Sequence, residues 1–309
     1  MTKRKIFLLS LIGVLAVTYI FQLIFASRGK ITEIKVKGEI AKIEITNKEE
    51  KLDLTKNEDS WLISENLPAK AELVQTLSST LSSIKVIDSI KKNPSPADFE
   101  KYGLTSGITV EGYSADSKKL VKLLIGKTST TGNQTYIQLN DSKEILLVSL
   151  NLNDYFSITE KQLLDMTLYT TNANDIYKIA VTYSPSGAFT AEKAGEMADF
   201  KWNVTGADLD VDLTKFNSDK FQQWINSITE LSASKWLTDF NVSDTELDDS
   251  RYYSITIYAA EKEIKVDLYQ VKADFGSEKL CICSENEYLC EITADDVHRI
   301  VTELSNFID

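Results

Sequence analysis

Four aspartates between positions 208 and 219 have the residue type and part of the spacing of a calcium-binding loop. Asp208, Asp210 and Asp212 fall at the first, third and fifth places of such a loop, and Asp219 falls at the twelfth. The sixth place needs glycine for a sharp turn, but this chain has leucine there, and the twelfth is usually glutamate. The alternative is an acidic connector whose apolar residues contact the core: Leu209, Val211 and Leu213. We expect the connector and treat the four aspartates as a weak calcium candidate.

The three cysteines of the chain lie within ten residues of one another: Cys281, Cys283 and Cys290. With a turn within Ser284–Glu287, an antiparallel hairpin places Cys281 opposite Cys290. A disulfide between these two is geometrically plausible if they form a close, non-hydrogen-bonded pair, and Cys283 would then be left over. Buried free thiols are one alternative. A metal or redox site is the other, although three cysteines lack a fourth ligand.

The remaining motifs point to structure rather than to chemistry. Gly126, Lys127 and Thr128 look like the end of a phosphate-binding loop, but such a loop needs another glycine where this chain has Val121. We therefore expect a turn that ends a strand. The single histidine, His298, cannot form a multi-histidine zinc site and falls on the polar side of a helical pattern. With no catalytic constellation in the sequence, we expect a non-enzymatic protein without a cofactor.

Two halves of the chain show the same order of predicted elements. The first half opens with period-2 strands, one of which contains Trp61. A helix then begins near Pro68 and repeats apolar residues at helical spacing: Leu73, Leu77, Leu81 and Ile84. Four antiparallel strands follow, and apolar residues suggest one closing helix: Leu152, Phe156 and Leu163.

The second half repeats this order, with Trp202 as the counterpart of Trp61. Its helix contains Phe221, Trp224, Ile225, Ile228 and Leu231, and its last helix would carry Val297, Ile300, Val301, Leu304 and Phe307 on one face. The matching order predicts an internal duplication.

Hairpin-length connections favour antiparallel sheets with helices on one face, which is an α+β fold rather than an α/β fold. We predict three regions in the chain. Residues 1–30 form a cytoplasmic tip and an anchor, residues 31–168 form the first α+β repeat, and residues 169–309 form the second.

The segment Ile6–Ala26 contains no charged residue and is long enough for a helix that crosses a bilayer. It is longer than the apolar core of a cleavable signal peptide, and its large final residues give a poor cleavage site. Because Lys3, Arg4 and Lys5 precede it, the positive-inside rule predicts a cytoplasmic N-terminus and an extracytoplasmic body. We therefore expect a single-pass protein of the cell membrane.

Acidic residues dominate the rest of the chain. All 46 Asp and Glu but only 29 of the 34 Lys and Arg lie beyond residue 30, so the body has a net charge of −17. Such a body repels the phosphates of nucleic acids, which are therefore poor partners. It is also repelled by anionic lipid, so we do not expect it to lie on the membrane beyond its helix.

Short motifs in the first half resemble a bacterial family called domain of unknown function 4340. They are Trp61 in its strand, the run from Phe99 to Leu104 with Tyr102 and Gly103, the run from Leu124 to Lys127 with Gly126, and Tyr136-Ile137. Gly103 is expected in a left-handed turn, with Tyr102 and Leu104 packing on either side. In the second half, Phe240-Asn241-Val242 stands where the Tyr-Gly-Leu motif would be, so that copy departs from the pattern.

The resemblance implies a membrane-anchored, extracytoplasmic protein, often encoded beside the permease and auxiliary subunit of gliding-motility-type ABC transporters. It brings no catalytic residues. We therefore expect an accessory or scaffold protein of an ABC-type transport or envelope complex, with a permease or auxiliary subunit as partner.

The alternative is a binding module for an envelope glycan, a peptide or a transported solute in the crevice between the repeats. Aromatic residues would line that crevice: Tyr113, Tyr136, Trp202 and Tyr252. A hydrolase would instead need two carboxylates that converge in a pocket.

Overall fold

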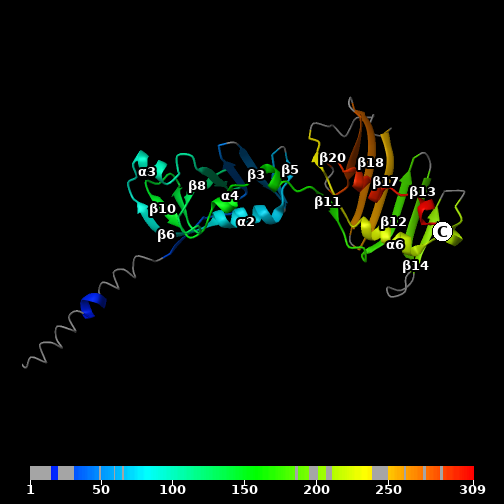
Figure 1. Cartoon of the computed structure of the whole chain (residues 1–309), viewed down its shortest axis with the longest axis horizontal. Helices are drawn as coiled ribbons and strands as arrows, with labels where there is room; N and C mark the ends of the chain where they lie inside the picture. Colours follow the sequence, from blue (N-terminus) through cyan, green and yellow to red (C-terminus); the bar gives the residue numbers. More distant parts are fainter. Residues whose placement is uncertain are drawn as a thin grey trace, which may run out of the picture. The chain divides into compact units, whose positions relative to one another are not determined.

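The computed structural model describes most of the chain beyond the N-terminal segment. The described residues are 15–19, 31–48, 50–58, 60–64, 66–184, 187–194, 201–206, 211–238, 250–260, 262–273, 276–285 and 288–309. They form two compact units, one ending at Asp165 and the other beginning at Met166 (Figure 1). Both units consist mainly of antiparallel strands, with a few short helices.

The first unit contains a ten-stranded antiparallel sheet in the order β1-β6-β10-β9-β8-β7-β2-β3-β4-β5. Its strands are β1 (Thr32–Lys35), β2 (Lys42–Thr46), β3 (Lys51–Asn57), β4 (Ser60–Ile63), β5 (Leu67–Pro68), β6 (Ser83–Lys91), β7 (Ile108–Tyr113), β8 (Lys119–Thr128), β9 (Thr135–Leu139) and β10 (Ile145–Val148). Its helices are α2 (Ala71–Ser82), α3 (Pro96–Lys101), α4 (Asn153–Phe156) and α5 (Glu160–Leu163).

The second unit contains an eight-stranded sheet in the order β14-β13-β12-β17-β18-β19-β20-β16 and a two-stranded sheet of β11 and β15. The strands are β11 (Thr167–Thr170), β12 (Ile176–Tyr183), β13 (Gly187–Ala194), β14 (Lys201–Gly206), β15 (Glu230–Ser232), β16 (Lys235–Trp236), β17 (Arg251–Ala259), β18 (Lys262–Ala273), β19 (Gly276–Cys283) and β20 (Leu289–Glu291). The helices are η2 (Leu213–Lys215), α6 (Ser218–Ser227), α8 (Ala294–Ile300) and η3 (Leu304–Phe307).

The two large sheets share one strand order. Read from β6, the first runs β6-β10-β9-β8-β7-β2-β3-β4, and read from β16, the second runs β16-β20-β19-β18-β17-β12-β13-β14. Strands at the same position in the two sheets therefore also come in the same order along the two halves of the chain, as β2 and β12 do. The first sheet adds β1 beside β6 and β5 beside β4. The repeated order of elements predicted from the sequence is thus a shared topology.

Alternation of apolar and charged residues gives each strand one core face. Ile43 and Ile45 of β2 are fully buried. Glu44 lies between them, on the opposite face, where its carboxylate pairs with the Lys42 ammonium at 2.6 Å. Because successive side chains of a strand point to opposite faces, this pattern fixes which side of the sheet is covered.

Helix α2 lies along the first sheet and buries Val74, Leu77 and Leu81 (Figure 1). Its approach is close at Gly112 of β7, where an added Cβ would come within 3.0 Å of Leu81 Cδ2. Three details differ from the sequence prediction. Pro68 belongs to β5 and α2 begins at Ala71, because Pro68 pairs with Leu62 at the edge of the sheet. Residue 84 lies in β6, and Leu73 is 39% exposed.

The predicted closing helices are shorter than expected. In the first unit the chain leaves the helix after Phe156, and a capping box of Thr159 and Gln162 starts α5 separately. In the second unit Val301 has an extended backbone, so α8 ends at Ile300 and η3 follows.

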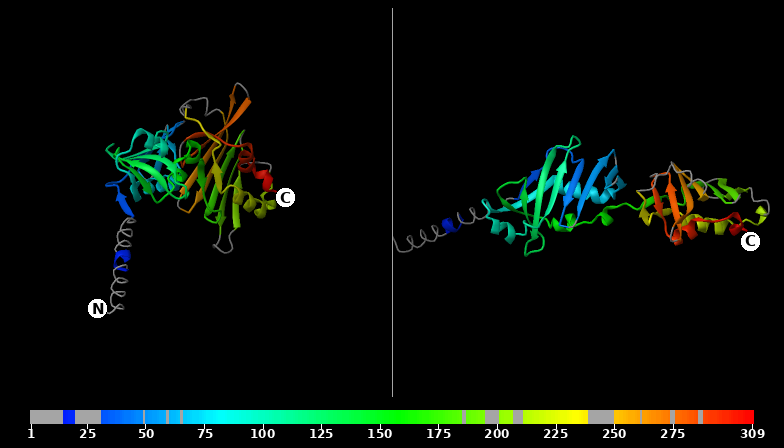
Figure 2. Two further views of the ribbon diagram at one scale, coloured as in Figure 1. Left: turned by 60° about the vertical axis from the view of Figure 1, so that its left-hand side comes forward. Right: turned by 90° about the horizontal axis from the view of Figure 1, so that it is seen from above.

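An aromatic cluster centred on Phe221 of α6 forms part of the core of the second unit. Its ring centroid lies 5.0 Å from that of Phe307 and 5.1 Å from that of Trp202. Edge-to-face contacts of this kind add to the stabilisation from burial. Because Phe307 belongs to η3, the cluster holds the end of the chain against α6. Figure 2 shows α6 and α8 on the same side of the second sheet.

No helix among the described residues is long and apolar enough to cross a membrane. Of the predicted span Ile6–Ala26, residues 15–19 are described; they are helical and exposed. Residues 6–14 and 20–26 lie outside the described residues.

Candidate functional site

The Tyr-Gly-Leu motif forms the end of helix α3. The helix starts with a capping box in which the side chains of Ser95 and Asp98 bond each other's backbone amides. It ends at Lys101 with Tyr102 as its C-cap, and Gly103 follows with a φ of +75°, a left-handed conformation that glycine adopts without strain. The amide of Leu104 then donates to the carbonyl of Phe99 at 2.8 Å, and the Leu104 side chain is buried. The left-handed turn predicted at Gly103 is confirmed.

This turn is in contact with the end of strand β8. The amide of Lys127 donates to the carbonyl of Tyr102 at 2.9 Å. An added Cβ at Gly126 would lie 2.3 Å from the same carbonyl oxygen, which is closer than real Cβ contacts. An added Cβ at Gly103 would lie 3.0 Å from the Lys127 nitrogen. The two glycines therefore allow the two motifs to touch through their backbones.

Two tyrosines and two lysines are displayed over this contact. The rings of Tyr102 and Tyr136 are 4.6 Å apart, and both residues are partly exposed. The ammonium of Lys101 lies 5.4 Å from the Tyr102 ring centroid, within range of a cation–π interaction. Lys127 is exposed beside them. We call these four residues, Lys101, Tyr102, Lys127 and Tyr136, the Tyr102 face.

Trp61 and Trp202 occupy matching places in the two units. Trp61 in β4 lies opposite Lys56 of β3, and Trp202 in β14 lies opposite Lys193 of β13. Both indoles are buried. Each tryptophan therefore belongs to the core of its own unit.

The comparisons with known proteins identify one family. A family model described as a domain of unknown function, DUF4340, matches residues 61–250, which is more than half of the chain. This chain belongs to the DUF4340 family. The match begins at Trp61 and includes the Tyr102 face and the first part of the second unit. The searches of curated proteins and of solved structures found no match.

The calcium candidate lies in the family-matched region, but the structure gives its described members other roles. The Asp212 carboxylate accepts hydrogen bonds from the amide and hydroxyl of Thr214, at 3.1 and 2.6 Å, and so caps η2. These bonds hold the pKa of Asp212 below its usual value. Asp208 and Asp210 lie outside the described residues, and Asp219 lies in the first turn of α6. Leu213, expected to contact the core, is 39% exposed. No group of three or more metal-binding side chains occurs among the described residues.

The three cysteines lie beyond the family match and are buried free thiols in the structure. Cys281 pairs with Cys290 across β19 and β20, as the predicted hairpin requires. The backbone hydrogen bonds of neighbouring residues show whether Cys281 and Cys290 form a hydrogen-bonded or a non-hydrogen-bonded pair. The Ser284 amide donates to the carbonyl of Lys265 in β18, so it points away from β20. The Leu289 carbonyl accepts from the amide of Leu237, so it points away from β19. By alternation, the amides and carbonyls of Cys281 and Cys290 point at each other, so they form a hydrogen-bonded pair.

The predicted disulfide between Cys281 and Cys290 required a close, non-hydrogen-bonded pair, and a hydrogen-bonded pair holds the two residues farther apart. Instead, the Cys290 thiol donates to the Cys281 carbonyl at 3.4 Å, and the Cys283 thiol donates to the Leu168 carbonyl at 3.6 Å. Contact with Cys290 and burial raise the pKa of the Cys281 thiol well above its usual value. Burial raises the pKa of Cys283 to about 11. Thiols that stay protonated are poor nucleophiles and poor metal ligands.

The two remaining motifs have the expected positions. Gly126, Lys127 and Thr128 end strand β8. His298 is exposed on α8. The predicted crevice between the repeats stays a prediction. Of the aromatics proposed for it, Tyr113 donates to Glu111 in the first unit, and Trp202 donates to Gln222 in the second.

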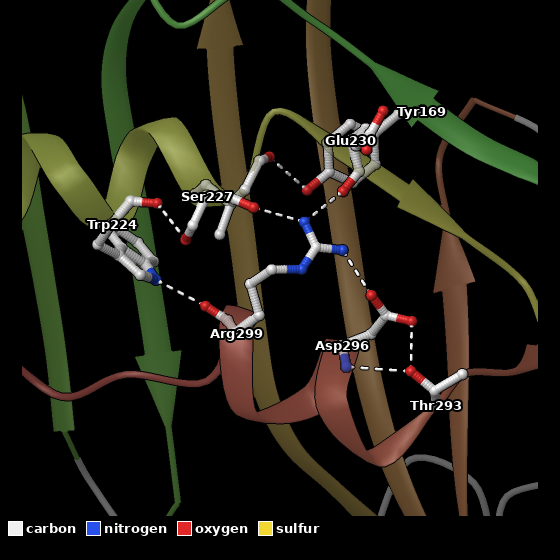
Figure 3. A network of polar contacts seen from close by, with 8 residues as sticks. Tyr169, Trp224, Ser227, Glu230, Thr293, Asp296 and Arg299 are labelled. Carbon is white, nitrogen blue, oxygen red and sulfur yellow. Dashed lines mark hydrogen bonds and ion pairs between the residues drawn. The ribbon is translucent and has the colours of Figure 1, made fainter.

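An arginine network in the second unit was not foreseen from the sequence (Figure 3). The Arg299 guanidinium donates to the carbonyl of Ser227, the last residue of α6, to the carbonyl of Glu230, and to the Asp296 carboxylate. The Trp224 indole in turn donates to the Arg299 carbonyl at 3.1 Å. Arg299 thereby ties α8 to the C-terminal end of α6, where a cation is favoured. One part of this network could have been predicted from the sequence, because Thr293 and Asp296 have the spacing of a capping box at the start of a helix.

Proposed function

We propose that this protein is a membrane-anchored, extracytoplasmic accessory protein, without enzymatic activity, of an ABC-type transport or envelope complex. The observation that carries the proposal is the Tyr102 face. The glycines of the family motifs allow the backbone of the turn after α3 to contact the end of β8. Aromatic and cationic side chains lie around that contact. Such an arrangement suits the binding of another protein.

The Tyr102 face has the chemistry of a protein interface. Tyrosine is enriched at such interfaces and at their energetic hot spots. The backbone hydrogen bond between Lys127 and Tyr102 fixes the face before a partner arrives. A preorganised surface loses less conformational entropy on binding, which favours affinity.

Charge supports the same assignment. Several lysines of the first unit are paired with a nearby acid, within a strand as Lys42 is with Glu44, or on a neighbouring strand as Lys119 is with Glu111 at 2.6 Å. Among the described ion pairs, none includes Lys101 or Lys127. Their charges are available to acidic groups of a partner, which would steer association and fix the register of the complex.

The N-terminal segment places the first unit near the membrane in this proposal. Five residues, 27–31, separate the uncharged segment Ile6–Ala26 from β1. An extended chain spans at most about 3.5 Å per residue, so the first unit would start within roughly 20 Å of the bilayer. A permease or auxiliary subunit in the same membrane is then within reach of the Tyr102 face. We further propose that the two units, with their common strand order, are copies of one module.

Co-purification from gently solubilised membranes tests this function. The tagged full chain is compared with Lys101→Glu/Lys127→Glu and with the matched control Lys92→Glu/Lys161→Glu, whose lysines are exposed outside the face. We expect permease-type subunits with the wild type and the control, and roughly tenfold lower recovery with the face variant. Repeated isolation of the wild type alone, or equal recovery with all three chains, would contradict the proposal.

A further inference from the structure

A groove with basic walls lies at the start of the first unit. It has a volume of about 350 Å³ and runs between β1, the turn from β7 to β8, and the end of β9. Its walls carry four lysines: Lys35, Lys37, Lys118 and Lys119. No acidic side chain is among the residues that line it. This local charge is opposite to the net charge of −17 on the body.

Two of the four lysines are balanced by carboxylates outside the groove. Lys35 lies 3.5 Å from Glu33, and Lys119 lies 2.6 Å from Glu111. Lys37 and Lys118 take part in none of the ion pairs between described residues, and both are exposed. The groove therefore keeps two cationic groups that a ligand can use.

Between the lysines the groove is apolar. Ile84, Val121 and Leu139 are buried beneath it, while Val36 and Leu120 are only partly buried. An apolar floor with a cationic rim fits an amphiphilic anion better than a small, fully hydrated one. A lysine ammonium suits a phosphate, and the floor suits the carbon atoms attached to it.

The path of the chain indicates where such a ligand comes from. The groove includes Ile34–Lys37, within about ten residues of the uncharged segment Ile6–Ala26. At 3.3 to 3.6 Å per residue, it lies at most roughly 40 Å along the chain from the end of that segment. The proposed anchor thus brings the groove to the lipid headgroups of one leaflet.

We propose that this groove binds the headgroup of an acidic phospholipid, with Lys37 and Lys118 on its phosphate and the apolar floor against its glycerol carbons. The inference rests on the proposed membrane anchor, which supplies the lipid surface. The bound lipid would hold the first unit in one orientation above the bilayer, although the rest of the body is repelled by the same lipids.

Native mass spectrometry of the full chain tests the groove. The chain is kept in neutral detergent and mixed with equal amounts of phosphatidylglycerol and phosphatidylcholine. We expect preferential retention of one phosphatidylglycerol, with at least tenfold weaker retention by Lys37→Gln/Lys118→Gln, because each lysine near a lipid surface contributes appreciably. The matched control, Lys92→Gln/Lys161→Gln, removes two exposed lysines outside the groove and should bind like the wild type.

Three results would overturn the proposal: equal retention of the two lipids, unchanged binding by the groove variant, or displacement of the lipid by inorganic phosphate at comparable concentration. The last result would show a free-phosphate site. Resistance of the full chain to alkaline extraction from membranes is measured separately. An extractable chain would contradict the anchor, whereas the detergent experiment would still report on the groove.

Discussion

The amide of Lys127 donates a hydrogen bond to the carbonyl of Tyr102 at 2.9 Å, which joins the two motifs that characterise the first unit. Glycine at position 126 makes this approach feasible, since a Cβ there would lie 2.3 Å from the same carbonyl oxygen. The contact fixes the turn after α3, and this turn carries the Tyr102 face, to which we propose that a partner protein binds.

Gly126→Ala should therefore destabilise the first unit strongly. We expect a loss of about 3 kcal/mol in the free energy of unfolding, because the methyl group meets backbone that cannot move freely. Gly132→Ala is the matched control: its φ is +81° but a Cβ there would meet nothing within 4 Å, so about 1 kcal/mol is expected. Chemical denaturation measures both. Equal effects of the two substitutions would argue against the close contact.

Arg299→Ala should destabilise the second unit. The change leaves the Asp296 carboxylate without its cation and two backbone carbonyls without a donor, which costs about 2–4 kcal/mol. Lys235→Ala is the control, because its ion pair with Glu291 is largely exposed and contributes less than about 0.5 kcal/mol. Hydrogen exchange of α6 and α8 should locate the effect of Arg299→Ala. Unchanged exchange in those helices would contradict the proposed tie.

Lowering the pH should remove the part of the stability of the second unit that comes from the Asp296 carboxylate. Burial raises the pKa of Asp296, but the bonds from Thr293 and Arg299 outweigh it, so the folded pKa lies below its usual value. The contribution of the Asp296 carboxylate to the free energy of unfolding is therefore complete above the unfolded pKa of about 3.9. It is lost as the pH falls through the pKa of the folded state. Unfolding of the wild type and of Asp296→Asn should differ at pH 7 and converge at low pH. A difference that is constant with pH would refute the assignment.

The cysteines should behave as three protected thiols. In the native protein at neutral pH, alkylation should be slow because all three thiols are buried and because the pKa values of Cys281 and Cys283 are raised. After denaturation without reductant, mass analysis should find all three alkylated. Two cysteines that react only after reduction would establish a disulfide instead.

Local patterns predicted more of the fold than of the site. Alternation around Ile43 and Ile45 predicted the strands, and the hairpin pattern predicted the register of Cys281 with Cys290. The predicted repeat of one series of elements appears in the structure as one strand order in both large sheets, but that order itself was not predicted. Pro68 was misassigned to a helix start because its pairing with Leu62 at the edge of the sheet is a tertiary contact.

The site depends on contacts that no local pattern contains. Gly103 could be placed in a left-handed turn from its neighbours. The partner of that turn, Gly126, comes from a distant strand, so the reason for both glycines emerges only in the folded chain. Arg299 likewise bonds the backbone carbonyls of Ser227 and Glu230, at and beyond the end of α6, and the type of a residue does not tell whether its backbone carbonyl accepts such a bond.

Site-specific photo-crosslinking tests the central claim most directly. A photoreactive phenylalanine analogue replaces Lys101 in the Tyr102 face of the full chain, or replaces the exposed Lys92 as control, and the membranes are irradiated before solubilisation. We predict a crosslink from position 101 to a permease or auxiliary subunit in the same membrane, and none from position 92. No crosslink from position 101, or the same crosslinked species from both positions, would contradict this prediction.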